Sequence, residues 1–253
     1  MSNSPSSSNK SAVILGATSA VARAAAAELA RHGYSLVLGA RAQDENDTIA
    51  ADLRVRFNAT VHALPFSAED YDTHPAFLDT CRELLGDIDG VVLCFGYLEQ
   101  QTVAQQDFVV ARRTVDVNYT AAVSILELFA KHFEERQAGF IAIVSSVAGD
   151  RGRQSNYIYG SSKAAVSAYA QGLRNRLYHA GVNVITIKPG FIDTKMTFGL
   201  PNLLLVASPE TVGRDIWNAI GKQKQIIYTP WFWRYIMLIV KTIPETIFKR
   251  LKM

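Results

Sequence analysis

The stretch AVILGATSAVARAAAAELARHGYSLVLGAR, residues 12–41, decides the fold. Its apolar run 12–16 predicts a buried strand, the alanine-rich run 19–32 predicts a helix, and 35–39 predicts a second buried strand. Strands that are apolar along their whole length and separated by helices are typical of a parallel sheet covered on both faces. The stretch therefore predicts a strand–helix–strand unit of a doubly wound α/β protein.

The same alternation of short apolar strands and longer helices continues along the chain. Further strands are expected at 60–65, 90–95, 140–145, 182–188 and 225–229, and further helices at 47–57, 73–85, 105–135, 157–180 and 208–222. No Pro/Gly-rich linker or internal repeat interrupts the pattern, which predicts a single domain with a Rossmann-type, doubly wound, parallel seven-stranded sheet. Ligands bind beyond the carboxyl ends of such strands, so the residues that follow the strands are site candidates.

Composition narrows the class of protein. The 253 residues, 49% of them hydrophobic, suffice for a large core, and residues 1–10 are polar enough to form a disordered leader. Cys81 and Cys94 show neither metal-ligand spacing nor a disulfide framework, so we expect a cytoplasmic protein without a metal site. Nucleic-acid binding has little electrostatic support, because the basic excess is confined to residues 226–253, whose net charge is +4 in a chain of +3.

The turn after the first expected strand can hold a dinucleotide. Gly16 permits a tight turn, and Thr18 and Ser19 offer hydroxyls beside the free N–H groups and the positive dipole end of the next helix. Ala20 and Ala22 stand where a Gly-x-x-x-Gly-x-Gly loop would have its second and third glycines. A well-packed turn without a cofactor therefore stays an alternative.

The end of the second expected strand bears on the choice of cofactor. Residues 38–42 contain no acid that could bind the ribose hydroxyls of NAD, whereas Arg41 can bind the 2′-phosphate of NADP through a charge-assisted fork. Arg41 favours NADP(H). NAD(H) as cofactor and a solvated loop arginine remain the alternatives.

Three side chains around the fifth expected strand form the most informative pattern. Tyr159 and Lys163 are four residues apart, so they share one face of the expected helix 157–180. Ser146 ends a buried strand at the edge where ligands bind. Together with the first turn, this pattern resembles the short-chain dehydrogenase/reductase family, and the resemblance covers about residues 11–230.

The resemblance implies NAD(P)H-dependent reduction of a keto group. It implies Tyr159 as general acid/base, Lys163 as the cation that lowers the phenol pKa and binds the nicotinamide ribose, Ser146 as the donor that polarises the carbonyl, and Asn118 in VDVNYTAAV as the anchor of a water relay. It also implies a homo-oligomer. The residues it assigns to the cofactor are Gly16, Thr18, Ser19, Val21, Arg41, Gly96, Tyr159, Lys163, Pro189, Gly190, Ile192 and Thr194.

The chain also departs from the family pattern. The acidic residue that usually contacts adenine matches Pro65, and the Asn-Asn-Ala-Gly run after the fourth strand matches Leu93-Cys94-Phe95-Gly96. These departures concern cofactor geometry and affinity more than the catalytic chemistry. A non-catalytic dinucleotide-binding scaffold is the alternative that they leave open.

Three local stretches are similar to the branch of the family that reduces decaprenylphosphoryl keto-ribose. They are VNYTAAVS (117–124), GDRGRQSNYIYGSSKA (149–164) and PWFWRYIMLIVKTIPETIFKRL (230–251). The similarity implies a polyprenyl-phosphate-linked keto sugar as substrate and a flavin-dependent oxidase as partner. Arg151 and Arg153 follow Ser146 closely enough to bind the phosphate. The alternatives are two solvated arginines and a soluble reductase of another ketone or alcohol.

Residues 231–253 are expected to form an amphipathic, basic, helical tail. The apolar run 235–240 is far shorter than the roughly 20 residues that a membrane span requires. The rings of Trp231, Trp233 and Tyr235, with the basic charge, suit an anionic lipid interface, so the tail can contact the inner face of the plasma membrane. Helices packed on the sheet edge or on a partner subunit are the alternative.

Overall fold

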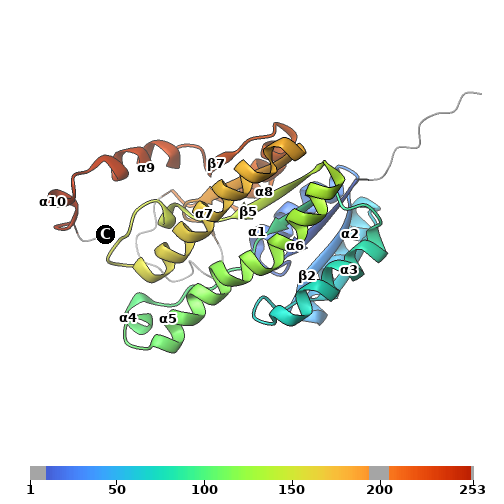
Figure 1. Cartoon of the computed structure of the whole chain (residues 1–253), viewed down its shortest axis with the longest axis horizontal. Helices are drawn as coiled ribbons and strands as arrows, with labels where there is room; N and C mark the ends of the chain where they lie inside the picture. Colours follow the sequence, from blue (N-terminus) through green and yellow to red (C-terminus); the bar gives the residue numbers. More distant parts are fainter. Residues whose placement is uncertain (1–9, 194–204, 252–253) are drawn as a thin grey trace, which may run out of the picture.

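A seven-stranded sheet forms the centre of the molecule (Figure 1). This computed structural model describes residues 10–193 and 205–251. The strand order is β3-β2-β1-β4-β5-β6-β7, and all neighbours are parallel. The strands are β1 (Ser11–Leu15), β2 (Ser35–Ala40), β3 (Val61–Pro65), β4 (Gly90–Leu93), β5 (Gly139–Val144), β6 (Val182–Pro189) and β7 (Ile226–Thr229).

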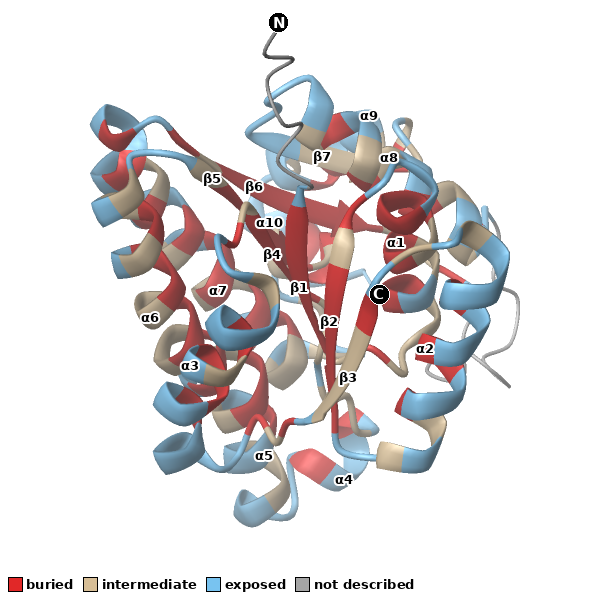
Figure 2. Cartoon of the chain, turned by 90° about the vertical axis from the view of Figure 1, so that its right-hand side faces the viewer, coloured by how far each residue is buried: buried red, intermediate tan, exposed pale blue. Residues whose placement is uncertain are grey.

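Helices cover both faces of this sheet (Figure 2). One face carries α1 (Ala20–Arg31), α2 (Gln43–Phe57) and α8 (Pro209–Gly221), and the other carries α3 (His74–Leu85), α6 (Ala121–Arg136) and α7 (Tyr157–Leu177). Every residue of β1 and β4 is buried, because both faces of these strands are covered by helices. The prediction of a single-domain Rossmann-type fold is confirmed.

The strand order changes direction at β1: β2 and β3 are added on one side of this strand, and β4 to β7 on the other. After β3 the chain returns to add β4 on the other side of β1, with Leu15 opposite Leu93 in register. Such a switch point leaves an opening beyond the carboxyl ends of the two strands, where α/β proteins bind ligands.

The expected single helix 105–135 is wrong. The structure has α4 (Gln101–Ala104), α5 (Phe108–Val115), a π-helical turn at Asp116–Thr120, and then α6. The break before α5 arises because the Asp107 carboxylate accepts a hydrogen bond from the Val109 N–H at 2.8 Å and so starts a new helix. Helix α2 also begins at Gln43, four residues before the expected start.

The C-terminal segment contains two short helices beyond β7. Figure 1 shows α9 (Trp233–Thr242) and α10 (Glu245–Phe248) on the same side of the molecule as α4 and α5. Short 3₁₀ turns lie at Tyr71–Thr73, Val147–Gly149 and Tyr178–Ala180. Within the described ranges, every helix is too short or too polar to cross a bilayer. Residues 1–9 of the expected leader and Thr194 lie outside the described residues.

Candidate active site

The turn after β1 joins the ends of three strands. Gly16 has a φ of +79°, and a Cβ there would lie 2.6 Å from the Phe95 nitrogen, just beyond β4. Only glycine tolerates both the backbone conformation and this close approach. The N–H groups of Gly16 and Ala17 donate to the Gly39 carbonyl at the end of β2, at 2.9 and 3.1 Å. The carboxyl ends of β1, β2 and β4 are thereby held together around the turn.

The first turn of α1 offers backbone donors at this edge. Ser19 caps the helix, and its Oγ accepts from the Ala22 N–H at 3.2 Å. Val21 and Ala22 are buried in the core between α1 and the sheet, whereas Thr18 and Ala20 are half-buried. The Ala22 methyl group therefore packs into the core. The helix N-terminus remains suited to a pyrophosphate, so the geometry fits a dinucleotide.

Arg41 lies directly beyond β2 and is largely exposed. Its guanidinium is 3.9 Å from a Glu69 carboxylate oxygen, and 69% of its side chain is accessible. Glu69 itself is bound more closely by Arg113, through two hydrogen bonds of 3.0 Å. An arginine that is so weakly paired at a strand end is available to a phosphate.

Tyr159 and Ser146 come together from two elements. Tyr159 lies half-buried in the first turn of α7, and Ser146 follows the end of β5. Burial raises the pKa of Tyr159 to about 12, and hydrogen bonding with Ser146 acts in the opposite direction. The phenol is thus protonated throughout the neutral range, which is the form that a general acid requires.

Lys163 lies one turn further along α7 and is almost completely buried. Its Nζ donates to the Val144 carbonyl at 3.1 Å and lies 5.8 Å from the centroid of the Tyr159 ring. Burial lowers the pKa of Lys163 to about 8, and the Cys94 thiol opposes this change. A pKa near 8 keeps most of the charge at neutral pH, where an ammonium stabilises a phenolate.

Asn118 holds the loop after β4 against α7. Its Oδ1 accepts from the Tyr97 N–H, and its Nδ2 donates to the Tyr97 carbonyl, both at 2.8 Å. The same Nδ2 donates to the Ser162 hydroxyl at 3.0 Å. A Cβ on Gly96 would lie 3.1 Å from Asn118 Oδ1 and 3.3 Å from Lys163 Nζ. The π-helical turn that carries Asn118 thus brings its amide beside the lysine.

The end of β6 contacts the C-terminal helices. Gly190, which follows Pro189, donates its N–H to the Thr229 carbonyl at 3.0 Å, and any side chain on it would overlap the Trp233 ring. Ile192 is buried and forms a bridge with Ala207. The glycine is therefore required by packing against α9, a contact that its assignment to the cofactor did not anticipate.

Arg151, which we expected to bind a substrate phosphate, is bound to the C-terminal helices instead. Its guanidinium donates to the Val240 and Ile243 carbonyls, both at 2.6 Å, and to Glu245 at 2.9 Å. Its carbon Cζ lies 3.7 Å from the centroid of the Phe248 ring. Contacts with α9 and α10 therefore occupy this side chain, because the tail folds back onto the loop that follows Ser146.

Arg153 differs from Arg151 in its contacts. One terminal nitrogen donates to the Val147 carbonyl at 3.3 Å, but the buried Nε has no hydrogen-bond partner within the described part of the chain. Burial lowers the pKa of Arg153, and the Asp150 charge opposes that change. Beside the short turn that follows Ser146, the Arg153 guanidinium thus keeps a charge and an Nε–H donor without a partner among the described residues.

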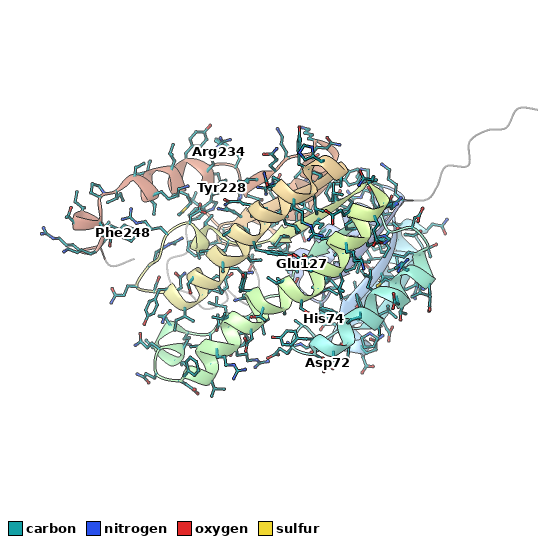
Figure 3. The ribbon with its side chains drawn as sticks, viewed as in Figure 1. Asp72, His74, Glu127, Tyr228, Arg234 and Phe248 are labelled. Atoms are coloured by element: carbon teal, nitrogen blue, oxygen red, sulfur yellow. The ribbon has the colours of Figure 1, made fainter. Side chains whose placement is uncertain are left out.

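A buried ionic cluster next to Ser146 was missed from the sequence. The Asp150 carboxylate accepts hydrogen bonds from Lys188 Nζ and, at 2.7 Å, from the Tyr228 hydroxyl (Figure 3 labels Tyr228). The Asp150 side chain is only 2% exposed and that of Lys188 10%. The sequence signal for this cluster was Lys188, a charged residue at the end of the apolar strand β6. A buried charge requires a partner of opposite charge, so an acidic residue could have been expected nearby.

The arrangement can protonate and polarise a carbonyl oxygen. A protonated phenol, a serine hydroxyl and a buried ammonium meet at the carboxyl edge of the sheet, beside a turn that fits a dinucleotide. A hydride donor bound at that turn would lie at the same edge as the acid. Such a site suits hydride transfer coupled to proton transfer.

Comparisons with known proteins agree with this geometry. The family model described as short chain dehydrogenase matches residues 10–201. An uncharacterized oxidoreductase of Mycobacterium tuberculosis is 33% identical over 94% of this chain and 96% of its own. Another, from Streptomyces coelicolor, is 34% identical over 96% of both chains.

Solved structures share the fold. A short-chain dehydrogenase from Sphingobium yanoikuyae, in complex with NADPH, has a TM-score of 0.81 at 24% identity and covers 93% of this chain and 97% of its own. A variant of actinorhodin polyketide ketoreductase with NADPH has a TM-score of 0.80 at 19% identity and covers 87% of this chain and 95% of its own.

Proposed function

The chain belongs to the short-chain dehydrogenase/reductase family and is an oxidoreductase that acts on CH–OH or C=O groups, and from this premise we propose that it reduces a keto sugar carried on a polyprenyl phosphate, with NADP(H) as its cofactor. Bound NADPH would supply the hydride. The side chains of the chain itself bind the carbonyl oxygen and supply the proton.

Proton transfer follows from the positions of three side chains. The Ser146 and Tyr159 hydroxyls donate to the carbonyl oxygen, whose negative charge grows during reduction. Tyr159 then gives up its proton, and the Lys163 ammonium stabilises the phenolate that remains. Solvent returns the proton to the phenol for the next turnover.

Arg153 is the observation that supports a phosphate-linked substrate. Its side chain is partly buried beside the turn that follows Ser146, and its Nε donor has no partner among residues 10–193 and 205–251. An unpaired donor costs free energy unless a ligand binds it, and a guanidinium binds phosphate oxygens through a planar fork. A phosphate close to the keto group of the sugar would satisfy it.

Replacing Arg153 by alanine is expected to lower kcat/KM for a polyprenyl-phosphate keto-pentose by about 10- to 100-fold, because charge-assisted contacts to phosphate are lost. The rate with diacetyl, a small diketone without phosphate, should change by less than about threefold. Steady-state kinetics with both substrates measures the ratio. Arg153→Lys is the control, since it keeps the charge without the fork. Equal losses on both substrates would refute the phosphate contact.

Arg41 supports the choice of NADP(H). It is exposed beyond β2, its ion pair with Glu69 is long at 3.9 Å, and no acid stands at positions 38–42. The 2′-phosphate of NADP would give it a stronger partner.

Arg41→Ala is expected to raise the Kd for NADPH by about 10- to 100-fold and to leave the Kd for NADH within about twofold, because only NADPH carries the 2′-phosphate. Fluorescence titration of both nucleotides measures this. Arg82→Ala is the matched control, because Arg82 is also exposed and pairs loosely, at 3.7 Å, with Asp79 on α3. An unchanged NADPH Kd in the Arg41 variant would reject the preference. Binding of neither nucleotide by the native chain would contradict the dinucleotide site and, with it, the proposed reduction.

The outer face of α9 supports a lipid-linked substrate. While Trp233, Met237 and Val240 are buried against the body, the opposite side of the helix is apolar and exposed. The exposed fractions are 59% for Tyr235, 58% for Leu238 and 65% for Ile239. Because the buried side of the same helix reaches Val147, next to Ser146, this exposed face lies close to the candidate site.

We take an anionic bilayer as the partner of this face. Arg234 and Lys241 are seven residues apart on one side of α9, and neither forms an ion pair within the described part of the chain (Figure 3 labels Arg234). A symmetric contact with a second copy would bring these like charges together, whereas anionic headgroups attract them. We also propose that the enzyme works at the inner face of the plasma membrane, where a flavin-dependent oxidase of the same lipid-linked sugar would supply the keto substrate.

A further inference from the structure

The turn that carries Ser146 is held from three sides. Ser146 caps the 3₁₀ turn Val147–Gly149, and its Oγ accepts from the Ala148 N–H at 3.0 Å. The two residues that follow this turn, Asp150 and Arg151, bind different elements.

Asp150 ties the turn to the sheet. Its two carboxylate oxygens bind Lys188 at the end of β6 and Tyr228 in β7. All three side chains are at least partly buried, so water competes weakly for these bonds. The position of the turn relative to β6 and β7 therefore depends on one carboxylate.

Arg151 ties the turn to the tail. Its side chain is 14% exposed, and it binds the last carbonyls of α9 and the Glu245 carboxylate of α10. Cations that bind the carbonyls of a helix C-terminus are favoured there by the helix dipole. Val147 packs in the same cluster as Trp233 and Phe248, so polar and apolar contacts join the same two segments.

The third side of the turn is α7. A Cβ on Gly149 would lie 2.7 Å from the Lys163 carbonyl carbon, and one on Gly160 would lie 2.8 Å from the Ala148 oxygen. The turn thus packs directly on the backbone of the helix that carries Tyr159 and Lys163. Ser146 belongs to the turn and Tyr159 to the helix, so displacing the turn along this contact would move the Ser146 hydroxyl relative to the Tyr159 phenol.

We propose that Asp150 and Arg151 are positioning residues which, by joining the Ser146 turn to the sheet edge and to the C-terminal helices, hold the Ser146 hydroxyl at the reacting carbonyl. The expected change in kcat rests on the proposed keto reduction. The expected change in the stability of the turn does not. It makes the C-terminal helices part of the active-site framework. Neither residue contacts the reacting atoms.

Tyr159 provides a reporter of the Ser146 position. Hydrogen bonding with Ser146 acts to lower the pKa of Tyr159, and the other charged or titratable groups at this place are Lys163 on α7 and Cys94 after β4. Moving Ser146 away would raise the pKa of Tyr159 further. The phenol would then give up its proton less readily, and kcat would fall.

The experiment compares Arg151→Ala, Arg151→Lys and Tyr228→Phe, each in the native chain and in a Ser146→Ala chain. With diacetyl and NADPH, Arg151→Ala is expected to lower kcat by about 10- to 100-fold with an unchanged Kd for NADPH. Arg151→Lys should recover part of this loss, and Tyr228→Phe should lower kcat by a smaller factor. In the Ser146→Ala chain, Arg151→Ala should lower kcat by no more than about twofold, because residues that act through one group are not additive.

Tyr228→Phe guards against loss of folding, since it removes one bond to Asp150 and leaves the buried ion pair intact. Arg176→Ala is the matched control: Arg176 makes ion pairs of 2.7 and 2.6 Å with Glu127 and Glu134, away from the turn. It should leave kcat unchanged. Losses that are additive with Ser146→Ala, or a folded Arg151→Ala protein with native kcat, would overturn the proposal.

Amide hydrogen exchange separates this proposal from the proposed function. A peptide covering residues 145–152 should exchange about tenfold faster in Arg151→Ala than in the native protein, because local opening becomes easier, and should not change in Arg176→Ala. If the native protein reduces no ketone, the proposed function fails while this result still decides whether the two residues hold the turn. Unchanged exchange would overturn the positioning role.

Discussion

Tyr159→Phe is expected to lower kcat for keto reduction by about a thousandfold, because the variant keeps the ring but lacks the hydroxyl that we propose gives its proton to the carbonyl oxygen. The raised pKa of Tyr159, about 12, means that the native phenol carries this proton at every pH where the enzyme would be assayed. Steady-state oxidation of NADPH, followed by absorbance with diacetyl and with the lipid-linked substrate, measures the loss. NADPH binding should stay within about twofold, since the ring itself is preserved.

A neighbouring tyrosine offers a matched control for this variant. Tyr157 lies two residues earlier on α7, is 45% exposed, and donates only a long bond of 3.4 Å to Gln105. Tyr157→Phe should therefore retain native activity. A Tyr159→Phe enzyme with more than about a tenth of native kcat would be incompatible with the phenol as general acid.

The second large effect is expected at the membrane surface. The triple variant Tyr235→Ser, Leu238→Ser, Ile239→Ser should weaken binding to vesicles of phosphatidylglycerol and phosphatidylcholine by about 100- to 1000-fold, because the exposed apolar side of α9 is removed. Vesicle co-sedimentation measures the partition coefficient. Raising the salt concentration, or using vesicles of phosphatidylcholine alone, should weaken binding of the native chain, since headgroup attraction is screened or lost.

Two further variants test the assignment of this face. Phe108 and Val109 on α5 are even more exposed, at 78% and 73%, so Phe108→Ser with Val109→Ser is a control for general apolar exposure and should bind vesicles as the native chain does. Arg234→Gln with Lys241→Gln should weaken binding to anionic vesicles alone. If the triple variant binds vesicles normally but changes the size of the protein in solution, the face contacts a second copy.

Local signals predicted where the candidate catalytic side chains lie. Tyr159 and Lys163 lie on one face of α7 because side chains four residues apart on a helix are neighbours, and Ser146 follows a strand whose apolar run was visible in the sequence. The turn at Gly16 was predicted from a glycine after such a strand, and its φ of +79° confirms the tight turn. These features depend on neighbours within a few residues.

Long-range contacts account for what was missed. Arg151 and Arg153 are two residues apart in one loop and appeared equivalent as phosphate ligands, but the folded tail, about ninety residues later, binds only the first of them. The break before α5 was missed because the helical pattern outweighed the capping signal of Asp107. Gly190 was assigned to the cofactor, while the close contact with Trp233 explains the glycine.

Periodicity along the chain predicted the seven strands and most of the helices that cover them, and the spacing of Ser146, Tyr159 and Lys163 predicted that these three side chains share the carboxyl edge. Both signals are properties of residues that are close in the sequence. Only the tertiary structure decided the partners of buried charges. Asp150, Lys188 and Tyr228 are far apart in the chain, and their contact exists because β6, β7 and the Ser146 turn meet at one edge. Burial makes such pairing obligatory, but the choice of partner depends on how the strands are arranged.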